Sequence, residues 1–220
     1  MNRRQGLRSL GVALSVTLAG CVSESGSTDD GNGSDDDPNG DRVVSTDGFE
    51  RQISTPDVDD IPSNAPVEFD VQVVEETVTA DGTGFIEVSA TNTSDTEKQI
   101  WSPYYKGSSS AESEAGILLY SLTAPDSPEE DYTPDCIENP KATDEYVEMT
   151  DEGPLSHTLG PNETGTDRLI VVDDPTVDGC FPTGEYRFEN AHEYAGTEFT
   201  WGFTLRVTDN PAARNASSTR

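Results

Sequence analysis

The segment "EFTWGFTLRV", residues 198–207, decides the fold class of this chain. Apolar and polar side chains alternate along it, and the apolar set is Phe199, Trp201, Phe203, Leu205 and Val207. Successive side chains of a β-strand point to opposite faces, so this period of two predicts a strand with one face in a core and the other in solvent. No segment of the chain carries a comparable apolar stripe with the 3.6-residue period of an α-helix.

Five other segments have the composition of strands, and they are residues 67–73, 85–91, 116–122, 166–172 and 184–190. Asp81-Gly82 precedes the second of them, and this dipeptide favours the tight turn of a β-hairpin. About seven short strands separated by turn residues predict an all-β protein, an antiparallel sandwich over residues 64–210. We expect residues 211–220 to be a disordered tail.

Two turn segments resemble those of known domains. One is Leu159-Gly160-Pro161-Asn162-Glu163-Thr164, ahead of a predicted strand, and the other is Pro182-Thr183-Gly184-Glu185-Tyr186, at the start of the next. They resemble the turn and the tyrosine corner of immunoglobulin-like and fibronectin-like domains, in which the tyrosine hydroxyl forms a hydrogen bond with the loop backbone. The resemblance implies an immunoglobulin-like sandwich. Trp101 departs from the antibody pattern, because it precedes both Cys136 and Cys180.

The chain is strongly acidic, with 13 Lys and Arg residues against 43 Asp and Glu residues and a formal net charge of -30. Nucleic acid is excluded as a partner, because phosphate binding needs a basic patch. Self-repulsion at this charge destabilises a compact fold in dilute buffer, but at molar salt the Debye length falls to about 3 Å and the repulsion is screened. The composition therefore indicates adaptation to brine. Intrinsic disorder is the alternative, and the patterned apolar residues after residue 66 argue against it.

The first twenty residues have the features of an export signal. Arg3, Arg4 and Arg8 accompany an apolar run that is too short for the roughly 20 helical residues of a membrane span. Leu18-Ala19-Gly20-Cys21 resembles the lipobox of lipoprotein signal peptides, and the Arg3-Arg4 pair resembles a twin-arginine export signal. Together with the acidic composition, these motifs resemble the secreted lipoproteins of extremely halophilic archaea.

This resemblance implies a processing step and a location. Residues 1–20 are then a signal peptide, and Cys21 is the lipidated N-terminus of the mature chain. The membrane is a partner through the lipid anchor, and the protein lies on the extracellular face of the cell membrane. An ordinary secretory leader and an uncleaved N-terminal anchor are the alternatives.

Residues 21–63 have the composition of a solvated spacer. Ser, Gly, Asp, Asn and Pro dominate and large apolar side chains are few, so we expect a disordered acidic linker. A flexible coil of about 42 residues spans about 35 to 40 Å on average. Residues 35–40 match the first half of an EF-hand calcium loop, but Thr46 stands where that loop has its bidentate Glu. We therefore predict no metal site in the linker.

Cys136 and Cys180 are the only cysteines besides Cys21. Export places them in an oxidising compartment, where a remaining pair of cysteines predicts a disulfide. The bond would attach the polar segment that follows Cys136 to the sheet. Two buried free cysteines are the alternative.

The sequence contains no recognisable catalytic or cofactor motif. It has no HExxH, CxxC or GxSxG pattern, and its histidines are His157 and His192, which we expect to be surface or hydrogen-bonded loop residues. The spacing excludes a blue-copper site, because Met149 precedes both Cys180 and His192. We expect no enzyme, no cofactor and no metal. Paired carboxylates carry no information on glycosidase chemistry, because 43 acidic residues supply candidates at every spacing.

Residues 100–106, "IWSPYYK", are rich in aromatic side chains. Trp101, Tyr104 and Tyr105 are a candidate platform for a sugar or a protein, because Trp and Tyr dominate binding hot spots. In the alternative, which we favour, Trp101 fills the core and the tyrosines cover a sheet edge. Asn92 and Asn162 lie in Asn-x-Ser/Thr sequons at the ends of predicted strands and are candidate glycosylation sites.

These features favour a non-catalytic binding or scaffolding module at the cell surface, whose partner is another envelope protein or a glycan. A secreted hydrolase of unrecognised type and a solute-binding accessory of a transporter are the alternatives. The accessory is disfavoured, because one sandwich of this size lacks the two lobes that usually close on a solute.

Overall fold

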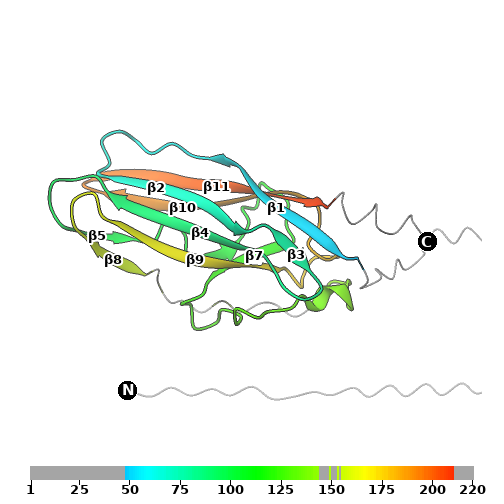
Figure 1. Cartoon of the computed structure of the whole chain (residues 1–220). Coiled ribbons are helices and arrows are strands. Elements are labelled where there is room, and N and C mark those ends of the chain that lie inside the picture. Colours follow the sequence, from blue (N-terminus) through cyan, green and yellow to red (C-terminus); the bar gives the residue numbers. More distant parts are fainter. Residues whose placement is uncertain (1–47, 144–148, 150–152, 154, 211–220) are drawn as a thin grey trace, which may run out of the picture. The chain divides into compact units, whose positions relative to one another are not determined.

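The computed structural model describes residues 48–143, 149, 153 and 155–210. They form an antiparallel β-sandwich with one short 3₁₀ helix, as the alternating sequence pattern predicts for the fold class (Figure 1). The strands are β1 (Glu50–Val58), β2 (Val67–Glu75), β3 (Thr77–Thr79), β4 (Phe85–Asn92), β5 (Lys98–Trp101), β6 (Lys106–Ser108), β7 (Ile117–Ser121), β8 (Ser156–Leu159), β9 (Thr164–Asp173), β10 (Gly184–Tyr194) and β11 (Thr197–Asp209), and the 3₁₀ helix is η1 (Asp135–Ile137).

Two larger sheets make the two layers of the sandwich. The first has the strand order β10-β11-β1-β3 and the second has the order β2-β4-β9-β7-β6. Strands β5 and β8 pair with each other in a small third sheet, which Figure 1 shows at the left end of the sandwich. Every pair of neighbouring strands is antiparallel.

Strand β11 confirms the prediction made from its sequence. Four of its five predicted inward side chains are buried, and they are Trp201, Phe203, Leu205 and Val207. Phe199 is half-buried and packs against the core. Arg206, which lies between Leu205 and Val207, and Thr208, which follows Val207, are exposed. The buried indole N–H of Trp201 donates a hydrogen bond to the carbonyl oxygen of Asp59 at 3.0 Å, so the core holds no unpaired group at this residue. The other five predicted segments are strands β2, β4, β7, β9 and β10.

Tyr186 forms the hydrogen bond that is expected of a tyrosine corner. Its ring is fully buried, and its hydroxyl donates to the carbonyl oxygen of Pro182. Burial raises the pKa of Tyr186 to about 12, so the hydroxyl keeps its proton at neutral pH. Gly116 passes close to this corner, where a Cβ atom would lie 2.8 Å from Cγ of Pro182. A larger residue at position 116 would therefore displace the turn.

Strand β1 lies in the segment that the composition assigned to the linker. It pairs with β11 on one side and with β3 on the other, so it is an interior strand of the first sheet. The sequence of β1 is mostly polar, and its one buried apolar side chain is Ile53. Its register with β11 shifts between Ser54 and Asp57, where Pro56 has no N–H to donate. The expected domain start at residue 64 is therefore wrong, because the first sheet already includes Glu50.

The second sheet has a buried outer face as well as a buried inner face. All five residues of β7 are buried. The outer face carries a separate apolar cluster, which consists of Phe85, Leu118, Tyr120, Ile170 and Val172. Side chains of the connection between β7 and β8 pack against it, and they are Leu122, Tyr132 and Met149. The connection thus covers a sheet face that would otherwise expose apolar area to water.

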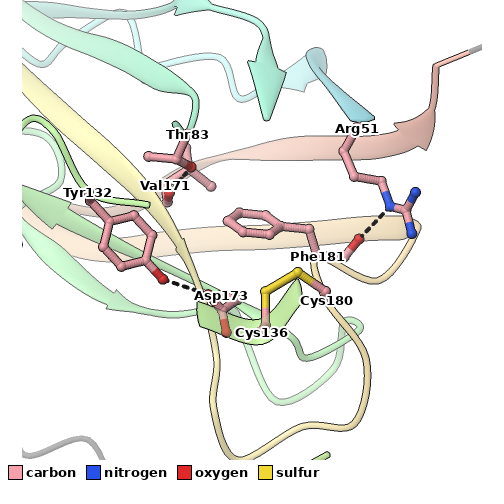
Figure 2. The surroundings of a disulfide bond; sticks show 8 residues. All are labelled: Arg51, Thr83, Tyr132, Cys136, Val171, Asp173, Cys180 and Phe181. Atoms are coloured by element: carbon pink, nitrogen blue, oxygen red, sulfur yellow. Dashed lines mark hydrogen bonds between the residues drawn. A yellow bond between two sulfur atoms is a disulfide. The ribbon is translucent and has the colours of Figure 1, made fainter. Parts of the chain in front are cut away.

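A disulfide between Cys136 and Cys180 attaches this connection to the sandwich, which confirms the predicted bond (Figure 2). Figure 2 also shows the hydroxyl of Tyr132, which donates to Oδ1 of Asp173 at 2.6 Å. On the other side of the disulfide, Nε of Arg51 donates to the carbonyl oxygen of Phe181 at 3.0 Å. The bond joins η1 to the loop between β9 and β10, and residues 144–148, 150–152 and 154 of the polar segment that follows Cys136 lie outside the described part of the chain.

Candidate functional site

The residues of the predicted export signal and lipid anchor lie outside the described part of the chain. They are Arg3, Arg4, Leu18, Ala19, Gly20 and Cys21. The predicted tail, residues 211–220, and the part of the predicted linker before residue 48 also lie outside it. Export and lipidation therefore stay predictions, and the candidate site consists of residues of the sandwich.

The structure separates the three residues of the predicted aromatic platform. Trp101 is 47% exposed, whereas Tyr104 and Tyr105 are only 3% and 7% exposed. After Trp101 the chain turns inward, and the ring of Tyr104 packs edge-on against Phe188 and Phe203 in the core, at centroid distances of 5.6 and 5.8 Å. The prediction is wrong for both tyrosines as platform residues. The favoured alternative placed Trp101 in the core, and it is wrong for this residue because Trp101 is exposed. The tryptophan of the core is Trp201.

Tyr194 of strand β10 holds the main chain of Trp101 in place. Its hydroxyl accepts a hydrogen bond from the Trp101 N–H at 3.1 Å and donates to the Trp101 carbonyl oxygen at 3.3 Å. Burial raises the pKa of Tyr194, so this hydroxyl stays protonated and keeps its donor. The backbone of Trp101 is fixed on both polar atoms while its indole projects into solvent.

The pairing of β5 with β8 places Trp101 among polar neighbours. Gln99 lies opposite Thr158 and Trp101 lies opposite Ser156, so these four side chains share one face, here called the Trp101 face. The other face carries Ile100 and Leu159, which are buried in the main core. Nε2 of Gln99 donates to Oγ of Ser156 at 2.8 Å across the strands. Sequence reasoning missed Gln99, Ser156 and Thr158, because four-residue strands give too short an alternation to recognise.

His157 attaches the small sheet to the second large sheet. Its Nε2 lies 2.9 Å from Oδ2 of Asp167, whose side chain is 6% exposed. The ring packs against Gly165, where a Cβ atom would lie 2.6 Å from Cγ of His157. In the described part of the chain, no hydroxyl or thiol forms a hydrogen bond with His157. The pair therefore fixes β8 against β9, and the expected hydrogen-bonded histidine lies in a strand instead of a loop.

His192 lies in a strand too, and it belongs to an aromatic cluster beneath the β10–β11 hairpin. Its ring centroid is 4.9 Å from that of Phe69, 5.5 Å from that of Phe199 and 6.3 Å from that of Tyr194. Its Nε2 is buried and has no hydrogen-bond partner among the described residues. Desolvation lowers the pKa of His192 to about 4, so the ring is neutral at pH 7. This neutral, half-buried imidazole supports the packing of the hairpin against β2.

The two candidate glycosylation sites have opposite environments. Asn92 is fully buried, and its Nδ2 lies within hydrogen-bond distance of the carbonyl oxygens of Thr96, Leu159 and Gly160. A glycan on that nitrogen would have no room, so the prediction is wrong for Asn92. Asn162 is exposed in the turn before β9, where it adopts a left-handed conformation with φ of 61°. Its modification stays a prediction.

Neither a metal-binding arrangement nor a match to a known protein assigns a function to this chain. Within the described residues, no group of three or more His, Cys, Asp or Glu side chains is placed to hold a metal ion. No helix of the described chain has the length and apolar character of a membrane span. Comparison of the chain with family models, curated proteins and solved structures finds no match. The function is therefore inferred from the geometry of the Trp101 face.

Proposed function

We propose that the protein is a membrane-anchored, extracellular binding module that contacts another component of the cell envelope and does not catalyse a reaction. The observation that carries the proposal is the exposure of Trp101, 47%, on a main chain that Tyr194 fixes. Trp is the residue most enriched at binding hot spots, and a pre-ordered backbone lowers the entropy lost on binding.

The location in the envelope rests on the sequence motifs. The lipobox with Cys21 supports the anchor, and the Cys136–Cys180 disulfide is typical of an oxidising, extracellular compartment. Cys21→Ser tests this part of the proposal. We expect the variant to appear in the soluble fraction or to remain unprocessed, and a normally processed, membrane-bound variant would refute the anchor.

The binding role is tested with the full chain and isolated native envelopes at molar salt. We expect Trp101→Ala to weaken binding by about tenfold or more. Val74→Ala is the matched control, because Val74 is 45% exposed on β2 and lies outside the Trp101 face. The control should bind like the wild type. Undiminished binding by a folded Trp101→Ala variant would contradict the proposed function.

The alternative of a secreted hydrolase draws on one observation, the contact between His157 and Asp167. A carboxylate that orients a histidine is two thirds of a hydrolytic triad, and a nucleophile would have to complete it. His157→Gln tests this alternative against a panel of ester, peptide and glycoside substrates. We expect no hydrolytic activity in either the wild type or the variant, and an activity that disappears in the variant would establish the hydrolase.

A further inference from the structure

The Trp101 face is uncharged, although the chain is strongly acidic. Its members are Gln99, Trp101, Ser156 and Thr158, and neither β5 nor β8 contains a carboxylate. The two basic residues of these strands, Lys98 and His157, lie opposite Leu159 and Ile100 and therefore on the other face. By contrast, the outward residues of β2 include Glu68 and Asp70, which are exposed. A neutral ligand can cover the Trp101 face without desolvating an ion, which is the main cost of covering an acidic surface.

The exposed indole offers a flat apolar platform. It stays in solvent while its own backbone is fixed by Tyr194. A pyranose ring has an apolar face formed by its axial C–H groups, and these groups lie against the electron-rich face of an aromatic ring. A charged or fully polar ligand would gain little from this surface, so the indole favours a ligand that is part apolar and part hydroxylated.

The polar neighbours of the indole match sugar hydroxyl groups. Ser156 and Thr158 each offer a hydroxyl that both donates and accepts, and Gln99 offers an amide with both functions. The hydrogen bond of 2.8 Å from Gln99 to Ser156 orders two of these groups before a ligand arrives. Residues two apart in a strand are about 7 Å apart, so the polar pair Gln99 and Thr158 lies about one sugar unit along the strands from the indole.

We infer that the ligand of the Trp101 face is a neutral glycan, with one hexopyranose ring stacked on Trp101 beside Ser156 and the hydroxyls of a neighbouring unit bound by Gln99 and Thr158. The inference rests on the proposed binding function and names its ligand class. The Trp101 face has no charge, although the chain has a net charge of -30. A neutral glycan therefore fits this face better than a basic protein, which would bind to the carboxylates elsewhere on the surface.

Trp fluorescence of the full chain at molar salt tests the inference. The chain has two tryptophans, of which Trp101 is 47% exposed and Trp201 is fully buried, so a stacked sugar changes the emission of the exposed indole alone. The probes are a soluble β-glucan, a mannan and a galactan, with alginate as the anionic comparison. We expect saturable binding of at least one neutral polysaccharide and none of alginate.

Two substitutions place the binding on this face. Trp101→Ala should abolish the response, and Gln99→Glu, which adds a charge at an exposed position, should weaken binding about tenfold. Gln72→Glu is the matched control, since it adds the same charge at an exposed position of β2 and should leave binding unchanged. Because Gln99 is exposed, its variant retains the fold even if Trp101→Ala does not.

The results separate this inference from the proposed function. If Gln99→Glu binds the polysaccharide like the wild type, or if alginate binds as well as the neutral polymers, the inference is overturned. If no polysaccharide binds while Trp101→Ala still loses its affinity for native envelopes, the ligand is a protein and the glycan inference fails alone. If Trp101→Ala retains its affinity for envelopes, the proposed function fails.

Discussion

The hydroxyl of Tyr194 lies 3.1 Å from the amide nitrogen and 3.3 Å from the carbonyl oxygen of Trp101, so one side chain satisfies both main-chain polar groups of an exposed residue. This contact joins the edge of the first large sheet to the small sheet that presents the Trp101 face. The rigidity of the face therefore depends on a residue that does not belong to it.

Tyr194→Phe keeps the ring beside His192 and removes only the hydroxyl. We expect the free energy of unfolding to fall by about 1 kcal/mol, the usual net value of a hydrogen bond. Affinity for native envelopes should also fall, because the backbone of Trp101 loses its restraint. Denaturant unfolding at molar salt measures the first effect and envelope binding measures the second. Unchanged values of both would show that the contact has no role in the face.

The lowered pKa of His192 predicts that the protein loses stability in acid. Its pKa is about 4 in the folded state against an ordinary value of 6.5, so the unfolded chain takes up the proton first. This contribution to stability is intact above pH 6.5, falls as the pH drops towards 4, and amounts to about 3 kcal/mol at most. His192→Phe should remove it, because a phenyl ring fits the aromatic cluster without a titrating nitrogen. Carboxylates titrate in both proteins, so the difference between the two pH profiles is the readout, and parallel profiles would contradict the prediction.

The disulfide predicts a large loss of stability on reduction. It joins residues 44 positions apart, and the loop-closure model assigns about 4 kcal/mol to such a bond. The double substitution of Cys136 and Cys180 by Ser should lower the free energy of unfolding by an amount of this order. It should also increase protease cleavage in the β7–β8 connection, which loses its attachment above the outer cluster. A thiol reductant should affect the wild type and leave the double variant unchanged.

Asn92 and Asn162 predict opposite responses to substitution. Asn92→Ala leaves buried carbonyl oxygens without their donor, and we expect a loss of about 2 to 3 kcal/mol. Asn162→Gly is the control in the neighbouring turn, where φ of 61° suits glycine, and it should cost little. In a host that glycosylates sequons, peptide mass spectrometry should find the modification at Asn162 and not at Asn92. A glycan on Asn92 would mean that this loop opens before folding is complete.

Glu193 and Glu198 lie directly opposite each other in the β10–β11 hairpin, and both are exposed. Like charges in this position destabilise a sheet by a few tenths of a kcal/mol up to about 1 kcal/mol. Glu198→Gln should therefore stabilise the protein at low salt, with a gain that disappears at molar salt, where the Debye length is about 3 Å. Glu185→Gln is the matched control, because Glu185 pairs with Arg206 and its loss should have the opposite sign. A gain from Glu198→Gln that persists at molar salt would point to packing instead of charge.

The local pattern of the chain was sufficient for the strands that alternate over many residues. Strand β11 followed directly from spacing, because each residue's orientation depends on its immediate neighbours in the strand. The corner role of Tyr186 followed from the resemblance of residues 182–186 to a tyrosine corner. Strand β1 could not be recognised, because its polar sequence and Pro56 resemble the linker, and its pairing partners β11 and β3 are what make it a strand. Strands β5 and β8 could not be recognised either, because four residues are too few to show an alternating pattern. The Trp101 face that they form was therefore not predicted as a whole.

The sequence by itself determined the all-β class, the pairing of Cys136 with Cys180, the acidic surface and the candidate export signal, because these follow from local periodicity, cysteine number and composition. Only the tertiary structure decided which aromatic residues face solvent. Trp101 is 47% exposed on a backbone that Tyr194, 93 residues later in the chain, holds with two hydrogen bonds, while Tyr104 turns inward against Phe188 and Phe203. Exposure of a side chain depends on what packs over it, and the packing partners come from distant strands.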